Sequence, residues 1–401
     1  MSNREAAVAW LVSLLVGAAC YAVTVPFGAE FEPQYMGESY QQMSVDPFGG
    51  LGPHPERFLT PLLAWLVGLS GERYWLFSHL LLVAWLALVH RLALQRSQDH
   101  VWAAAVTLGI AACGAADTMR HLCGYADATT YLLLTLAIVA LNRPVVFWTL
   151  LALGLLNHGM TLFLWPWFVF QRLRAGSIGW ADGVLPLVGV ACYWGARSVL
   201  MADAVGHALT VENYLSELAV ARTLDLWALI VPNMVFAYGP FLIVLMWHLV
   251  SERALSAAFG ALLMLGSVCV ILAFAIDIFR FVGLFTLCIT FAVARELNPS
   301  RRARWTLVAC VGLMMAILPW QRQLVDFLLK RHVEFAVQFA VQEDPSQTMP
   351  VIQGLIPAYW PVFVGYVAFV VLLFVLAWCT RPVERDDAIV AEARGARDPL
   401  C

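Results

Sequence analysis

Long apolar runs separated by short polar stretches make up most of the chain. Runs of about twenty residues recur along almost its whole length, and each is long enough to cross a hydrocarbon core of about 30 Å. Because backbone groups in lipid must find hydrogen-bond partners within the same segment, these runs are predicted to be α-helices. The pattern predicts about twelve spans, near 7–25, 75–95, 101–116, 127–141, 145–156, 160–171, 178–199, 227–250, 255–276, 281–294, 305–319 and 359–379.

Two parts of this pattern depart from a full crossing. The segments 145–156 and 160–171 are short for a hydrocarbon core of about 30 Å, which predicts that the polar turn Asn157-His158-Gly159 between them lies at membrane depth. The segment 58–70 fits the predicted topology only as a re-entrant or surface helix.

Arginine placement predicts the orientation. With a cytoplasmic N-terminus, the cytoplasmic loops collect an excess of arginines, as the positive-inside rule requires: Arg91, Arg96, Arg143, Arg172, Arg174, Arg253, Arg295, Arg301, Arg302, Arg304, Arg381 and Arg385. The expected fold is an all-α polytopic transmembrane bundle with both termini cytoplasmic. It forms one transmembrane domain, 1–380, with outer loops 26–74, 200–226 and 320–358, followed by a disordered cytoplasmic tail, 381–401.

Composition agrees with a membrane protein. Of the 401 residues, 61% are hydrophobic and 13% are charged, and the mean hydropathy is +0.77. Soluble domains carry about 25% charged residues. No basic run is long enough for nucleic acid, so the lipid bilayer is the expected partner and DNA or RNA is not. Cys113 and Cys123 lie near one helix–loop junction, where they could form a disulfide.

The first outer loop is the densest polar stretch of the chain. Glu30 and Glu32 follow the first span and would face the same side of an extended segment, where they could bind a divalent cation through oxygen or supply a general base. Asp46 and Arg57 lie further along the loop. An ordinary solvated loop is the alternative interpretation.

A second outer cluster lies between two spans. Arg120 and His121 are candidates for binding an anion, in company with Asp117. Asp127 opens the next span, where a carboxylate could cap the helix by accepting hydrogen bonds from free amides.

Further polar residues interrupt apolar segments. His158 lies in the turn at membrane depth, where polar side chains usually face a cavity or another polar group. Asp277 and Arg280 are one helical turn apart. They could contact a substrate, or they could form a structural ion pair. Arg322 and the basic residues after it would suit phosphate contact or an interfacial helix face.

This layout resembles the GT-C superfamily of membrane glycosyltransferases. The resemblance rests on an inside N-terminus, a first span followed at once by an acidic outer loop with Glu30-Phe31-Glu32 as a Glu-x-Glu version of the family's dyad, and the stretch Tyr40…Asp46-Pro47-Phe48…Arg57-Phe58-Leu59-Thr60-Pro61-Leu62-Leu63. Unlike the better-known members, the chain has no obvious Asp-x-Asp.

The resemblance implies a bacterial plasma-membrane enzyme that takes a sugar from a polyprenyl-phosphate donor on the non-cytoplasmic face. Glu30, Glu32 or Asp46 would then be catalytic. Substrate contacts would come from Arg57, Arg120, His121, His158, Asp277, Arg280 and Arg322, and a divalent cation is one option for a cofactor. A transporter, a surface-polysaccharide polymerase and a non-catalytic membrane protein are the alternatives.

Overall fold

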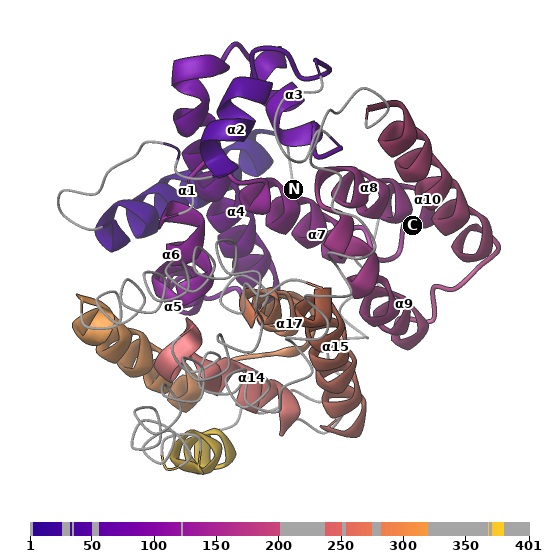
Figure 1. Ribbon diagram of the computed structural model, residues 1–401. Coiled ribbons are helices and arrows are strands. Elements are labelled where there is room, and N and C mark those ends of the chain that lie inside the picture. Colours follow the sequence, from indigo (N-terminus) through magenta and orange to yellow (C-terminus); the bar gives the residue numbers. More distant parts are fainter. Residues whose placement is uncertain are drawn as a thin grey trace, which may run out of the picture.

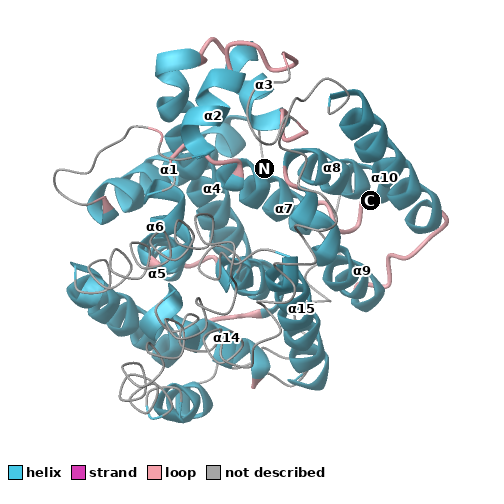
Figure 2. Cartoon of the chain, in the orientation of Figure 1, coloured by secondary structure: helices cyan, strands magenta, loops and turns pink. Residues whose placement is uncertain are grey.

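The computed structural model describes residues 3–25, 33, 36–49, 56–121, 123–200, 237–250, 254–274, 282–319, 368 and 371–380. Every regular element in these ranges is a helix (Figure 2). The predicted all-α class is therefore confirmed for the described part of the chain.

Residues up to Leu200 form a connected set of helices (Figure 1). Their bounds are α1 (Asn3–Thr24), α2 (Met36–Met43), α3 (Leu59–Leu66), the 3₁₀ turn η1 (Gly71–Arg73), α4 (Tyr74–Ser97), α5 (His100–Ala112), α6 (Gly114–His121), α7 (Asp127–Val139), α8 (Pro144–Asn157), the 3₁₀ helix η2 (Gly159–Leu164), α9 (Trp165–Arg174) and α10 (Ala181–Leu200).

Later helices pack below this set in the view of Figure 1. They are η3 (Gly239–Phe241), α14 (Leu242–Leu249), α15 (Ala254–Phe274), η4 (Gly283–Phe285), α17 (Thr286–Phe291) and the π-helical turn η5 (Ala292–Glu296). Two further helices run over Arg301–Pro319 and Val371–Thr380.

The helices α1 and α4 pack antiparallel. Ser13 Oγ lies 3.0 Å from His90 Nδ1, and the Tyr21 hydroxyl lies 2.6 Å from His79 Nδ1, so that later residues of one helix meet earlier residues of the other. At the crossing, a Cβ on Gly17 would lie 2.8 Å from the backbone nitrogen of Ala87. Glycine is favoured there, as is common where membrane helices approach closely.

The helices α8 and α9 form a hairpin through η2. Rings from the start of α8 meet rings of α9, with centroids 5.9 Å apart for Phe147 and Phe168 and 5.3 Å apart for Trp148 and Trp165. The turn begins at His158, whose extended backbone (φ −152°, ψ 112°) ends α8. The 14 residues of α8 rise about 21 Å, which is less than a hydrocarbon core.

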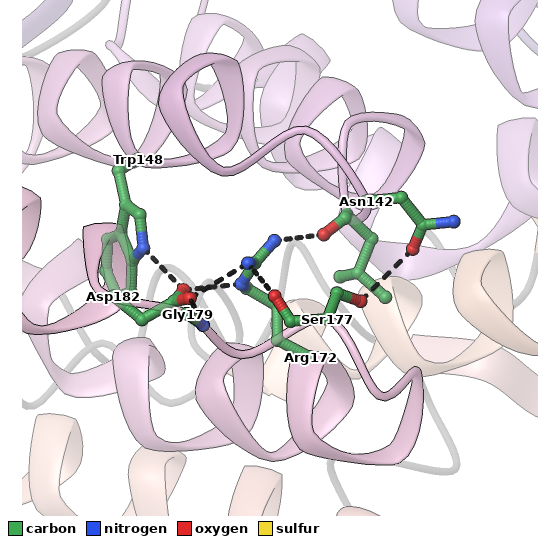
Figure 3. A network of polar contacts seen from close by, with 7 residues as sticks. Asn142, Trp148, Arg172, Ser177, Gly179 and Asp182 are labelled. Atoms are coloured by element: carbon green, nitrogen blue, oxygen red, sulfur yellow. Dashed lines mark hydrogen bonds and ion pairs between the residues drawn. The ribbon is translucent and has the colours of Figure 1, made fainter. Parts of the chain in front are cut away.

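A buried ion pair and its hydrogen bonds hold the opposite end of this hairpin (Figure 3). Arg172 Nε donates to Asp182 Oδ1 at 2.5 Å, and Trp148 Nε1 donates to the same oxygen at 2.8 Å. The Arg172 guanidinium also donates to the carbonyls of Leu141 and Ser177. Because Arg172 is fully buried, these acceptors replace the water that its charge has lost.

A second charged cluster lies at the same end. Glu296 Oε1 lies 2.5 Å from Arg174 Nη2, and its Oε2 lies 2.7 Å from His248 Nδ1. Burial alone would raise the pKa of Glu296, but the hydrogen bond and charge of His248 and the charge of Arg174 outweigh burial and lower it. Nearby, Arg304 pairs with Asp99 at 2.9 Å.

Four helices are long and apolar enough to cross a membrane: Asn3–Thr24, Gly71–Ser97, Ala181–Leu200 and Arg301–Pro319. The pair His100–Ala112 and Gly114–Arg120, bent by 53°, would make a fifth. Large apolar side chains on α1 and α10 remain exposed, such as Leu15 at 61% and Leu187 at 70%, as suits contact with lipid. Helices shorter than a full span occupy several of the other predicted segments, including 127–141 and 145–156.

The segment 58–70 holds only a short helix. α3 has eight residues and rises about 12 Å, so it is too short to cross. Trp65 and Leu66 at its end are exposed, whereas Leu59 and Ala64 are buried. A helix of this length is compatible with the re-entrant or surface helix that the predicted topology requires.

Candidate functional site

A buried hydrogen-bond network joins α3, α7 and α8. The Thr60 hydroxyl donates to Asn157 Oδ1 at 2.5 Å and lies 2.7 Å from the Thr129 hydroxyl. Asn157 Nδ2 donates to the Ala126 carbonyl and to Thr130 Oγ1, each at 2.8 Å. Asn157 is fully buried, and both ends of its amide have partners. The network therefore fixes the polar turn against the first residues of α7.

A small cavity lies beside this turn. Asp127 and His158 line it together with Thr130, Tyr131, Thr161 and Leu284, and its volume is about 20 Å³. That volume suffices for one water molecule. The arrangement brings the carboxylate of Asp127, at the start of α7, and the imidazole of His158, in the turn after α8, to one small cavity.

The imidazole of His158 is buried at the edge of the cavity. Its Nδ1 accepts a hydrogen bond from the Met160 amide at 3.3 Å. In a neutral ring this contact favours the tautomer that carries its proton on Nε2.

Asp127 is the first residue of α7 and follows the cap residue Ala126. A carboxylate in the first turn of a helix is favoured by the helix dipole. The half-buried side chain of Asp127 also borders the cavity. Its capping role stays a prediction.

An ion pair between distant segments lies close to the same turn. Glu56, just before α3, has its Oε1 3.6 Å from Nη1 of Arg197 on α10. The same Arg197 nitrogen lies 3.4 Å from the Tyr193 hydroxyl. A Cβ on Gly159 would lie 2.8 Å from that hydroxyl, so the pair and the polar turn are neighbours.

Sequence reasoning did not select Glu56 or Arg197 as site residues. Arg197 did carry a signal, because an arginine at the outer end of a predicted span opposes the positive-inside pattern. Nothing in the sequence paired it with Glu56, since the two residues lie far apart in the chain.

Both terminal nitrogens of Arg120 donate hydrogen bonds to the protein. It donates to the Thr24 carbonyl at 3.1 Å, to Thr24 Oγ1 at 2.9 Å and to the Ala111 carbonyl. Its guanidinium also lies 5.6 Å from the centre of the Tyr21 ring. Arg120 is 7% exposed, so the contacts shown tie α1 to α5 and α6.

Cys113 and Cys123 are both free and buried, so the disulfide suggested by their positions is wrong. Cys123 Sγ lies 3.4 Å from His79 Nε2. Burial raises the pKa of the Cys123 thiol to about 12, although a backbone hydrogen bond from Gly124 lowers it in part. The thiol therefore stays protonated and is a poor nucleophile.

Two predicted residues of the first outer loop are described. Asp46 is exposed, and its carbonyl accepts a hydrogen bond from the Gly49 amide in a turn. Arg57 Nη1 donates to the Tyr40 hydroxyl at 3.3 Å, next to α3. Both keep their predicted roles as hypotheses.

The remaining predicted site residues lie outside what the structure describes. Glu30, Glu32, Asp277, Arg280 and Arg322 fall in segments beyond the described ranges, and the side chain of His121 is not described. Within the described ranges, no group of three or more His, Cys, Asp or Glu side chains could hold a metal ion.

No protein-family model, no curated protein and no solved structure matches this chain. Functional inference therefore rests on the chemistry of the residues around the polar turn.

Proposed function

We propose that the chain is a membrane glycosyltransferase-like enzyme that moves a sugar from a polyprenyl-phosphate donor to an acceptor hydroxyl on the non-cytoplasmic face. The proposed topology is the predicted one: about twelve spans, cytoplasmic termini and a GT-C-like arrangement in the bacterial plasma membrane.

The observation that carries the proposal is the gathering of Asp127 and His158 around one cavity, with Glu56 and Arg197 beside it. In the proposed topology these residues lie at the non-cytoplasmic ends of α7, α8 and α10. Acids with a neighbouring arginine are the groups that such a transfer needs, because a hydroxyl must be deprotonated and a phosphate must leave.

The proposed reaction is a single displacement at the anomeric carbon. A carboxylate accepts the proton of the acceptor hydroxyl as its oxygen bonds to that carbon, and the bond from carbon to the phosphate oxygen breaks. Asp127 joins Glu30 and Glu32 as candidates for this base. The departing polyprenyl phosphate carries away the bonding electrons, and Arg197 and Arg57 are the candidates to stabilise its charge.

Purified protein offered radiolabelled polyprenyl-phosphate sugars tests the proposal. Wild type should transfer label to an acceptor fraction, and Asp127→Asn should lower the rate by about 10²–10⁴-fold if Asp127 is the base. Arg197→Gln should lower it by about 10²–10³-fold. Glu30→Gln and Glu32→Gln in the same assay show which acid accepts the proton of the acceptor hydroxyl.

The matched control is Glu72→Gln. Glu72 is an exposed acid of η1 on the same side of the bundle, so its loss should leave transfer unchanged. A wild type that transfers no sugar would overturn the proposed function. Full activity in all three acid variants, Asp127→Asn, Glu30→Gln and Glu32→Gln, would overturn the proposed mechanism.

One observation favours a transporter as a second candidate. The hairpin α8–η2–α9 is a broken helical segment with polar residues at its break, and transporters place substrate sites at such breaks. Uptake of a labelled solute into liposomes holding the protein, abolished by His158→Gln, together with no sugar transfer, would favour this candidate.

A further inference from the structure

A groove runs between the first turns of α1 and the α4–α5 junction, at the end of the bundle opposite the polar turn. Its volume is about 390 Å³. Val8, Ala9 and Val12 of α1 and Leu94 of α4 line it. Val8 and Val12 are four residues apart, so they present one continuous apolar strip along the helix. A hydrocarbon chain can pack against this strip.

Two cationic or hydrogen-bonding groups stand at the rim of this groove. Arg4 lies on α1, and His100 is the first residue of α5. Both are exposed. An arginine binds phosphate through charge and paired N–H groups, and an imidazole donates a hydrogen bond in either protonation state.

Two acidic groups lie near the rim. Asp99 accepts a hydrogen bond from the Trp102 amide at 3.0 Å and pairs with Arg304. Glu5 also lines the groove and is exposed. Arg4 and His100 are the two groups of the rim that can donate hydrogen bonds to a phosphate.

We infer that this groove binds an anionic phospholipid, with an acyl chain on the apolar strip and the phosphate between Arg4 and His100. Basic pockets between membrane helices are known to select anionic headgroups. In the proposed orientation the lipid belongs to the cytoplasmic leaflet. The choice of lipid rests on the groove itself and does not depend on the proposed enzymatic activity.

Native mass spectrometry of the full chain in detergent tests the inference with phosphatidylglycerol and phosphatidylcholine of identical acyl chains. Wild type should retain phosphatidylglycerol preferentially. Arg4→Gln and His100→Gln should each weaken that binding by about fivefold and leave phosphatidylcholine unaffected. Added inorganic phosphate should not displace the lipid, since a free anion gains nothing from the apolar strip.

Two further variants separate the groove from general surface charge. Ala9→Phe should fill the groove and lower retention of both lipids while the cations remain. Arg302→Gln removes an exposed arginine outside the groove and should change nothing. Equal retention of the two lipids by wild type, or the same loss in Arg302→Gln as in Arg4→Gln, would overturn the inference. The decrease in phosphatidylglycerol binding by Arg4→Gln is interpreted only if the thermal unfolding of this variant matches that of wild type. His100→Gln gives the same test at a second, independent position.

Discussion

Glu296 shows how a single carboxylate can hold several helices together. It pairs with Arg174 of α9 and His248 of α14, and its carbonyl accepts from Arg96 of α4. Its side chain is 14% exposed, so little water competes for these contacts. Removing its charge would leave the half-buried Arg174 and the buried His248 with a weaker partner.

We predict that Glu296→Gln lowers thermal stability at neutral pH, by a free energy on the order of 1–3 kcal/mol for the lost charged hydrogen bonds. The folded pKa of Glu296 is lowered, so its contribution is present above the unfolded value of 4.5 and is lost as pH falls through the folded pKa. The gap between wild type and variant should therefore close below about pH 4.5. Thermal unfolding in detergent across pH measures this gap.

The control is Glu72→Gln, whose exposed carboxylate should produce no gap at any pH. A gap for Glu296→Gln that persists unchanged in acid would contradict the role assigned to its charge.

At the residue scale, the sequence indicated part of the candidate site. His158 could be selected because a polar residue inside an apolar run has few roles other than facing a cavity or a partner. The cavity bears this out. Glu56 could not be matched to Arg197, because an ion pair between distant segments depends on how the helices pack.

At the element scale, apolar runs located most of the described helices to within a few residues. The predicted segment 145–156 corresponds to α8, where proline at the start and a polar residue at the end mark the boundaries. The predicted segment 160–171 became η2 followed by α9. A short apolar run does not distinguish a 3₁₀ turn from an α-helix, because both bury the same side chains.

Where two helices pack closely, some glycines cannot be replaced by a larger residue, and the apolar pattern of the sequence alone does not show which. We predict that Gly17→Ala destabilises the protein by about 1–3 kcal/mol, because the added Cβ would meet the backbone of α4. Thermal unfolding in detergent would measure the loss.

Gly266→Ala is the matched comparison. Gly266 lies within α15 with open space around the position of a Cβ, so the substitution should be neutral or stabilise the helix by up to about 1 kcal/mol. Equal effects at the two positions would contradict the close approach of α1 and α4.

At the scale of the whole molecule, the contacts gather three of the arginines at one end of the bundle. Arg174 and Arg96 meet at Glu296, and Arg304 meets Asp99 at the end of α4. All three arginines were predicted to share one side of the membrane. The number of full crossings could not be fixed in the same way, since helices such as α7, with 13 residues, are shorter than a hydrocarbon core.

Labelling with a membrane-impermeant maleimide would test this sidedness. Position 38 is exposed beside the polar-turn end, and position 302 is exposed at the arginine-rich end. We predict that Glu38→Cys labels in sealed right-side-out vesicles and Arg302→Cys labels only in inverted ones, each above the background of the native cysteines. The reverse pattern would invert the proposed orientation and move the candidate site to the cytoplasmic face.

The network around Asn157 also bears on how the protein is made. Its partners, Thr60, Ala126 and Thr130, all precede it in the chain. Chains emerge from the ribosome N-terminus first. When the amide of Asn157 enters the membrane, every group that forms a hydrogen bond with it has already been synthesised. The hairpin can therefore form these hydrogen bonds as it inserts.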